Sequence, residues 1–127
     1  MVPKNSTIRE IIRHKNEAII TALIADQTPT KEESNYWTTF LNQNTLVFLG
    51  PERLSQSFGH TLIFCKMSKL KRGYYEVEFI PLFDKPELTA EGEITKAHLQ
   101  LLEQIINEVP QYWLWSHKRW KHKQQAQ

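Results

Sequence analysis

A helical pattern ends where the stretch Pro110-Gln-Tyr-Trp-Leu-Trp-Ser-His-Lys-Arg-Trp-Lys121 begins. This stretch holds three of the four tryptophans of the chain. Pro110 is expected to end that helix, because its ring clashes with the helix backbone and it has no N–H to donate. Aromatic residues beside positive charge suit phosphate groups at a lipid or nucleic-acid surface. Burial in the core is an equally good interpretation for Trp113 and Trp115, and solvation is the default for the charges. Four basic residues supply the charge: Lys118, Arg119, Lys121 and Lys123.

The stretch resembles the signature of the bacterial lipid A late acyltransferases (the lauroyl/myristoyl acyltransferase family), roughly Pro-Glu-Gln-aromatic-x-Trp-x-His-Arg-Arg-aromatic-Lys. Three positions depart from it: Gln111, Tyr112 and Lys118. The resemblance extends over nearly the whole chain but covers only about the C-terminal half of a family member. The positions that match the signature are Pro110, Trp113, Trp115, His117, Arg119, Trp120 and Lys121.

Length and composition indicate one globular domain of 127 residues, placed at 1–123, with a disordered tail at 124–127. A net charge of +2 is too weak to argue for nucleic acid by itself. The single cysteine, Cys65, permits no internal disulfide. Because the chain has no apolar run of about 18 residues, any membrane contact is expected to be peripheral.

The N-terminal part predicts a helix followed by a buried strand. Residues 5–15 open with a capping box, Thr7 to Glu10, and carry isoleucines at helical spacing. Residues 18–25 form a nearly continuous apolar run, which is typical of a strand covered on both faces. Asp26 and Gln27 follow directly, where open α/β sheets place their ligand crevice. The alternative is an Asp that caps a turn before Pro29. The family has a similar strand ending in Asp-Gln, so the resemblance favours a substrate-binding role.

The middle of the chain predicts a second strand and helix. Residues 30–44 fit a short amphipathic helix, or a loop that folds its aromatic residues inward. A strand is expected at 45–49 and a helix from Gly50 to Gly59, with Pro51 in its first turn. Phe48-Leu49-Gly50 is similar to a Phe-Phe-Gly element of the family. Arg53 in the first turn is placed to meet an anionic group, with a solvated surface position as the alternative.

The remaining elements complete the expected fold. Strands at 61–67 and 74–83 predict an antiparallel hairpin with one wet face and a basic turn at 69–73. A helix is expected at 93–109, with His98 as a core histidine. Together these elements predict an α/β fold with a mixed sheet of about four strands flanked by helices. The resemblance makes this part of a larger, acyltransferase-type three-layer fold.

The chemistry of a complete active site is missing from the sequence. The family uses a His-x-x-x-x-Asp motif, in which His deprotonates the acceptor hydroxyl. Only His98 has an acid five residues on, and Glu103 lies about 140° around the helix from it, so the match is fortuitous. The chain has no glycine-rich phosphate loop, nucleophile elbow or metal-spaced cluster, so no cofactor or metal is expected.

The resemblance therefore implies the C-terminal portion of a lipid A acyltransferase-like protein, inactive as an isolated chain. The intact family transfers a fatty acyl chain from acyl carrier protein to a hydroxyl of a lipid A precursor, at the cytoplasmic face of the bacterial inner membrane. The alternative is a non-enzymatic module that binds anionic membranes, and a nucleic-acid binder is disfavoured because the tryptophans directly follow a helix stop. The expected substrate-binding residues are Asp26, Gln27, Arg53, His117, Arg119 and Lys121. The expected structural signature is Gly50, Pro110, Trp113, Trp115 and Trp120.

Overall fold

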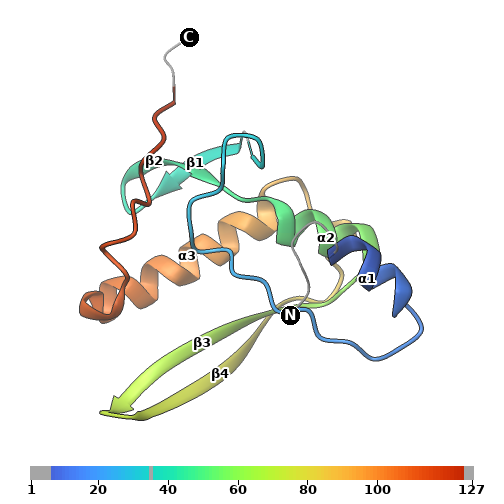
Figure 1. The fold of residues 1–127 in the computed structure, drawn as a ribbon, viewed down its shortest axis with the longest axis horizontal. Coiled ribbons are helices and arrows are strands. Elements are labelled where there is room, and N and C mark those ends of the chain that lie inside the picture. The colour runs from blue at the N-terminus through green and yellow to red at the C-terminus, as the bar shows by residue number, and fades with distance from the viewer. Residues whose placement is uncertain (1–6, 35, 125–127) are drawn as a thin grey trace.

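The computed structural model describes residues 7–34 and 36–124, with one long helix lying between two small sheets (Figure 1). The α/β class and the expected number of about four strands are confirmed, and the strands form two antiparallel pairs, β1–β2 and β3–β4. The helices are α1 (Thr7–Arg13), α2 (Gly50–Phe58) and α3 (Glu93–Glu108), with short 3-10 turns η2 (Pro86–Leu88) and η3 (Pro110–Tyr112). The strands are β1 (Tyr36–Phe40), β2 (Gln43–Val47), β3 (Leu62–Lys71) and β4 (Tyr74–Phe83).

The β1–β2 hairpin replaces the helix or loop expected at 30–44, and that expectation was wrong. Leu41 and Asn42 join the strands with φ angles of 48° and 58°, as in the tight turns that match strand twist. The inward packing is confirmed for Phe40, which is fully buried, and Tyr36 packs half-buried against the core. Period-two alternation in a five-residue strand is too short to be separated from helical spacing by pattern alone.

The expected buried strand at 18–25 is also wrong. The segment is irregular and exposed, and the exposed fractions of Ile20 and Ile24 are 99% and 81%. A strand exists only when its backbone groups pair with a neighbour. In the described part of the chain, each strand pairs only with its hairpin partner. The apolar composition of residues 18–25 therefore did not predict their burial, because no neighbouring strand pairs with them in the described structure.

The core lies between the β1–β2 hairpin and α3, where Phe40, Val47, Leu99 and Ile106 are buried together. Half-buried aromatic and aliphatic side chains pack around these four. They come from β1 and its turn, from α3 and from the C-terminal stretch: Tyr36, Leu41, Leu102, Trp113 and Trp120. Two of the tryptophans of the signature are therefore structural parts of this core.

Helix α2 begins at Gly50 and ends at Phe58, and the expected stop, Gly59, follows as its C-cap in the left-handed conformation at φ 64°. Glu52 on this helix is buried, with 1% of its surface exposed. Its carboxylate accepts the backbone N–H groups of Gly92 at 2.5 Å and Thr95 at 2.8 Å. These donors lie at the start of α3, where backbone N–H groups lack partners within the helix. A side chain of α2 therefore caps α3.

The β3–β4 hairpin is confirmed as antiparallel, with Arg72 and Gly73 at its turn. The expectation that one face would be dry is wrong. Tyr75, Val77 and Phe79 share a face and are 60%, 42% and 70% exposed. Helix α3 covers only the other face, through Phe64, whose ring centre lies 5.4 Å from that of His98.

The boundaries of the outer helices agree with the sequence. Helix α3 ends at Glu108 and Pro110 opens η3, so Pro110 stops the helix as expected. Helix α1 lies inside the expected range 5–15, of which residues 5 and 6 are outside the described part. Of the expected tail, Gln124 accepts a hydrogen bond from the Asn44 amide, and 125–127 lie outside the described residues. None of the helices in the described part is long and apolar enough to cross a bilayer.

Candidate functional site

The C-terminal stretch folds back over β1 and β2 and divides its tryptophans between core and surface. Trp113 and Trp120 flank the Phe40 ring, with ring centres 6.3 Å and 6.4 Å away. The indole N–H of Trp120 also donates to Thr45 Oγ1 at 2.8 Å. Trp115 faces outward with 55% exposure. Burial in the core is therefore the correct interpretation for Trp113 and the wrong one for Trp115.

Arg119 is a buried cation, contrary to the expectation that the charges of this stretch are solvated. Only 2% of its surface is exposed. Its Nη1 donates to the carbonyl of Leu46 at 2.8 Å, and the guanidinium lies 5.6 Å from the centre of the Phe40 ring. Burial lowers the pKa of Arg119 to about 10, an effect that Asp26 opposes. In the described structure its Nε and Nη2 are buried without a hydrogen-bond partner, so the guanidinium retains donor capacity.

The Asp26–Pro29 loop meets the signature through Thr28. The backbone N–H of Thr28 donates to His117 Nε2 at 3.1 Å. The Thr28 hydroxyl lies 2.7 Å from the carbonyl of Arg119 and 3.2 Å from that of Lys118, so it donates to this turn. Because an N–H group donates to Nε2, this ring nitrogen of His117 acts as an acceptor. Two segments about 90 positions apart in the sequence thus form one polar cluster.

Asp26 lies close enough to Arg119 to act on its charge, and it acts on His98 as well. Burial lowers the pKa of His98, Asp26 raises it, and Arg119 lowers it further. The structure therefore brings Asp26, His117 and Arg119, three of the expected substrate-binding residues, into one region of the fold. Gln27 and Lys121 are exposed beside the cluster.

Arg53 and Gly50 lie apart from this cluster. Arg53 is 62% exposed on α2 and pairs with Glu91 at 3.7 Å. Figure 1 shows α2 beside one end of α3 and the C-terminal stretch beside the other. At Gly50 a Cβ atom would lie 2.2 Å from the ring of Phe48, so the glycine permits this close approach.

His98 is the residue whose position sequence reasoning missed. The expected core position is met only in part, because His98 is half-buried against Phe64 and lies outside the buried core cluster. Glu103 accepts a hydrogen bond from the backbone N–H of Leu41, so the match at five residues is fortuitous, as argued. Asp26 and Arg119 both act on the charge of His98 although they lie 72 and 21 positions away in the sequence. No spacing in the sequence carries that information.

Because burial lowers the pKa of His98 from 6.5, the unfolded chain takes up this proton before the folded chain does. The free energy of unfolding is expected to fall as the pH drops below about 6.5, until the folded state is also protonated. In His98→Gln that contribution is absent. Urea unfolding of both proteins between about pH 7.5 and pH 5.5 measures the difference. Parallel pH profiles would show that His98 is not desolvated.

Thr28→Val is expected to loosen the Asp26–Pro29 loop. The substitution keeps the side-chain shape and removes the hydroxyl that bonds the carbonyls of Lys118 and Arg119. We expect a loss of about 1 kcal/mol in unfolding free energy and faster hydrogen exchange at the Thr28 amide. The matched control is Thr39→Val on the exposed side of β1, which should change stability by less than about 0.5 kcal/mol. Equal effects at both positions would contradict the contact.

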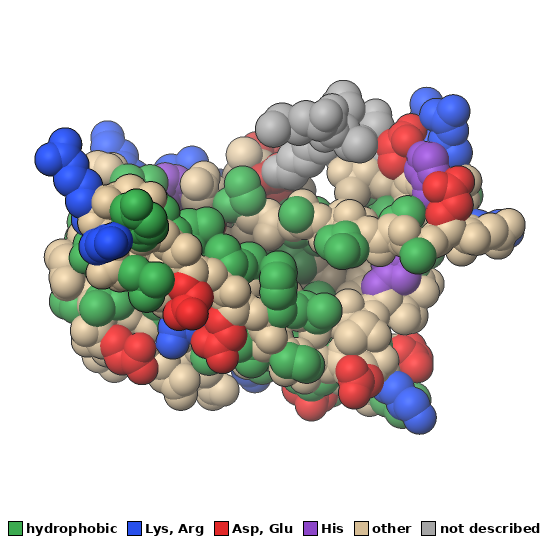
Figure 2. All heavy atoms as spheres, turned by 90° about the horizontal axis from the view of Figure 1, so that it is seen from below, with side chains coloured by type: hydrophobic (Ala, Val, Ile, Leu, Met, Phe, Trp, Pro, Cys, Tyr) green, Lys and Arg blue, Asp and Glu red, His purple; other side chains and the backbone are tan. Residues whose placement is uncertain are grey.

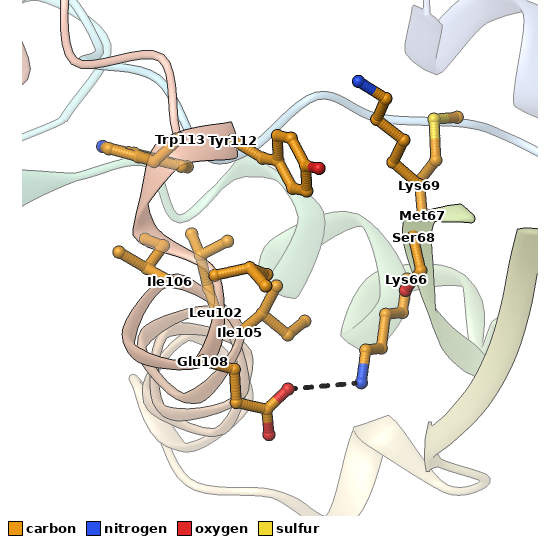
Figure 3. A pocket seen from close by; sticks show the side chains of 11 residues that line it. Lys66, Met67, Ser68, Lys69, Leu102, Ile105, Ile106, Glu108, Tyr112 and Trp113 are labelled. Atoms are coloured by element: carbon orange, nitrogen blue, oxygen red, sulfur yellow. Dashed lines mark ion pairs between the residues drawn. The ribbon is translucent and has the colours of Figure 1, made fainter. Parts of the chain in front are cut away.

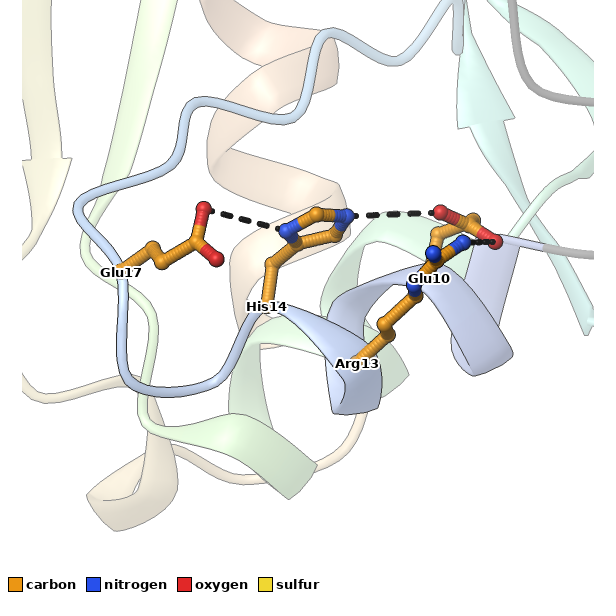
Figure 4. A network of polar contacts seen from close by, with 4 residues as sticks. All are labelled: Glu10, Arg13, His14 and Glu17. Atoms are coloured by element: carbon orange, nitrogen blue, oxygen red, sulfur yellow. Dashed lines mark hydrogen bonds and ion pairs between the residues drawn. The ribbon is translucent and has the colours of Figure 1, made fainter.

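A second histidine with carboxylate partners lies at the end of α1 (Figure 4). His14 Nδ1 is 3.1 Å from Glu17, and Nε2 is 3.5 Å from Glu10. Because both ring nitrogens face carboxylates, neither is directed to a substrate. Among the described residues, no group of three His, Cys, Asp or Glu side chains is arranged to hold a metal ion.

An open groove of about 240 Å³ lies between β3 and the end of α3 (Figure 3). Its floor is apolar, and Lys66 on its rim pairs with Glu108 at 3.8 Å. Lys69 lies 5.4 Å from the centre of the Tyr112 ring at the other end. Such a groove suits an aliphatic chain. The floor is made of Leu102, Ile105, Ile106 and Trp113.

No curated protein and no solved structure matches the chain. The sequence model of the bacterial lipid A biosynthesis acyltransferases matches residues 1–122, which includes the Asp26–Pro29 loop and the whole C-terminal signature. The chain belongs to the bacterial lipid A biosynthesis acyltransferase family.

Proposed function

We propose that the chain serves acyl transfer in lipid A biosynthesis by binding the head group of the lipid acceptor. The observation that carries this proposal is the contact between the Asp26–Pro29 loop and His117–Arg119. Both segments lie inside the region that matches the family. In this proposal the intact enzyme takes a fatty acyl chain from acyl carrier protein and transfers it to a hydroxyl of a lipid A precursor, at the cytoplasmic face of the inner membrane.

The residues of the cluster have separate roles in this proposal. Lys121 and Lys118 are exposed and suit anionic groups of the acceptor. His117 holds the Asp26–Pro29 loop in place by accepting the Thr28 N–H. Arg119 is a positioning residue, because its buried guanidinium fastens the signature to β2 through the carbonyl of Leu46. Asp26 and Gln27 then face the acceptor from the loop.

The chemical step needs a base that this cluster does not supply. The acceptor hydroxyl attacks the thioester carbonyl, a C–O bond forms, the C–S bond breaks, and the thiol leaves with a proton. His117 Nε2 accepts the Thr28 N–H, so it has no free lone pair for a substrate proton, and the half-buried His98 ring packs against Phe64. We therefore propose that the chain by itself does not transfer acyl groups, and that a His-x-x-x-x-Asp motif provides the base in an active enzyme.

The test is the affinity of the purified chain for a lipid A precursor in detergent, measured by calorimetric titration. Lys121→Gln is expected to weaken binding about fivefold, as for one lost contact between a cation and an anionic lipid. The matched control is Arg53→Gln, which removes a cation at the other end of α3 and should leave affinity unchanged. Equal losses at both positions would overturn the proposed site.

A non-enzymatic module that binds anionic membranes is the second candidate, favoured by exposed Trp115 and the lysines beside it. Replacing the precursor with phosphatidylglycerol in the same titration separates the two. A head-group site of this family should prefer the precursor by at least about tenfold. Equal affinity for both lipids would favour the module.

A further inference from the structure

The outer face of the β3–β4 hairpin is an apolar surface that the described chain leaves uncovered. Directly opposed residues in an antiparallel pair point to the same side of the sheet. The register pairs Cys65 with Phe79 and Met67 with Val77. The exposed fractions are 64% at Met67 and 70% at Phe79. The outer face comprises six residues, all of them exposed: Ile63, Cys65, Met67, Tyr75, Val77 and Phe79.

Charge is distributed unevenly over this hairpin. The outer face carries no acidic residue, and Glu76 and Glu78 alternate onto the opposite face. Four basic residues stand against these two acids between Leu62 and Phe83. Three of the four cluster at the tip: Lys69, Lys71 and Arg72. The hairpin therefore combines a contiguous apolar face with a positively charged end.

The tip has the composition of a surface that lies at a lipid–water boundary. Leu70 and Tyr74 are 66% and 60% exposed there. Lys71 Nζ lies 4.3 Å above the ring of Tyr74. Tyrosine is enriched at both bilayer interfaces, where its ring and hydroxyl occupy different environments. Lysine and arginine bury their stems along apolar surface and keep their charges at the head groups.

The hairpin also projects far enough to reach such a surface. Figure 1 shows β3 and β4 extending below α3 and away from the β1–β2 sheet. Figure 2, viewed from that side, shows hydrophobic side chains gathered across the middle of the molecule, with acidic side chains beside them. The C-terminal stretch is less suited to this role, because Trp113, Trp120 and Arg119 are turned inward.

We propose that the outer face and basic tip of the β3–β4 hairpin form a docking surface for an anionic phospholipid bilayer. Phe79, Val77 and Met67 enter the boundary between head groups and acyl chains, and the cations of the tip pair with lipid phosphates. The proposal rests on the proposed function in one respect, since a lipid acceptor resides in a bilayer. The surface would hold the chain where its acceptor is found.

The test is sedimentation of the full chain with vesicles that contain no lipid A precursor. One set is phosphatidylcholine, and the other contains equal amounts of phosphatidylcholine and phosphatidylglycerol. The chain is expected to bind the anionic vesicles and to bind the neutral ones weakly. Phe79→Glu should weaken binding at least about tenfold, because it places a charge where the apolar contact forms. Leu88→Glu, at an equally exposed leucine on η2, should leave binding unchanged.

Charge variants locate the cationic contact. Glutamine at Lys69, Lys71 and Arg72 together should weaken binding to anionic vesicles by on the order of 100-fold. The matched triple variant places glutamine at Lys15, Lys85 and Lys96, which are exposed outside the hairpin, and should change binding less than about threefold. A control variant that weakens binding as much as the tip variant would overturn the proposal. Circular dichroism of each variant checks that the fold is retained.

Two other outcomes would overturn the docking surface. One is a wild-type chain that fails to bind anionic vesicles. The other is a dimer in size-exclusion chromatography that Phe79→Glu converts to a monomer without affecting vesicle binding, which would assign the outer face to a second polypeptide. Neither outcome bears on binding of the precursor in detergent, so the proposed function and this surface fail independently.

Discussion

Phe40→Ala is expected to cause the largest loss of stability of any single truncation in the core. The Phe40 ring is fully buried and contacts Trp113, Trp120 and Arg119. Truncation removes its buried area and leaves a cavity between β1 and the C-terminal stretch, a loss of about 4 kcal/mol. This is a large part of the roughly 5–15 kcal/mol that stabilises a domain. Urea unfolding measures the change directly.

The effect of Phe40→Ala should extend beyond stability. Because Trp113 and Trp120 both pack on the lost ring, the tryptophan fluorescence of the folded variant is expected to shift toward that of solvated indole. The matched control is Phe79→Ala on the exposed face of β4, which should change stability by less than about 0.5 kcal/mol. If both alanine variants were equally stable, the proposed core would be wrong.

Glu52→Ala is expected to give the second large loss. The substitution leaves the backbone N–H groups of Gly92 and Thr95 without their acceptor in a buried position. Each unsatisfied buried donor costs about 1–3 kcal/mol, so a total near 3 kcal/mol is expected. The start of α3 also loses a negative charge that favours the helix dipole. The unfolding free energy from urea titration tests the magnitude.

Two further variants separate the contributions at Glu52. Glu52→Gln retains one acceptor oxygen for one of the two N–H groups and is expected to lose about half as much stability. Glu91→Ala removes an exposed carboxylate near the same helix end, whose ion pair with Arg53 is solvated, and should cost less than about 1 kcal/mol. A loss at Glu91 as large as that at Glu52 would show that the general charge, not the cap, matters.

Local signals predicted much of the fold. Gly59 with its left-handed backbone and Pro110 after α3 mark helix ends through chemistry that acts within a few residues. The strand at Tyr74–Phe83 was predicted with its observed bounds, because alternation over ten residues is a long signal. These features depend on neighbours in the sequence, so no tertiary information was needed.

The failures concern partners that are distant in the sequence. The apolar run at 18–25 has strand composition, but a strand requires a paired neighbour. No local pattern around Glu52 indicates that its carboxylate caps α3, which begins some 40 residues later. The same limit applies to Arg119. A charged residue in a basic stretch is expected on the surface, but Arg119 is buried over the ring of Phe40.

The site was partly predictable through resemblance. Asp26, His117 and Arg119 were selected because they match a family pattern, and Thr28 joins their two segments in the structure. Arg53 was selected from its place in a helix turn, and the structure pairs it with Glu91 away from the cluster. His98 carries no such pattern, since Asp26, which acts on its charge, lies 72 positions earlier in the sequence.

The central claim is that the Asp26–Pro29 loop and His117–Lys121 form one site for the head group of a lipid acceptor. Titration of the isotopically labelled chain with a lipid A precursor in detergent, followed through its backbone amide resonances, tests it most directly. Shifts are expected at Thr28, Arg119 and Lys121, beyond those caused by the detergent alone. If the precursor shifted amide resonances elsewhere in the chain but none in these two segments, the claim would be contradicted.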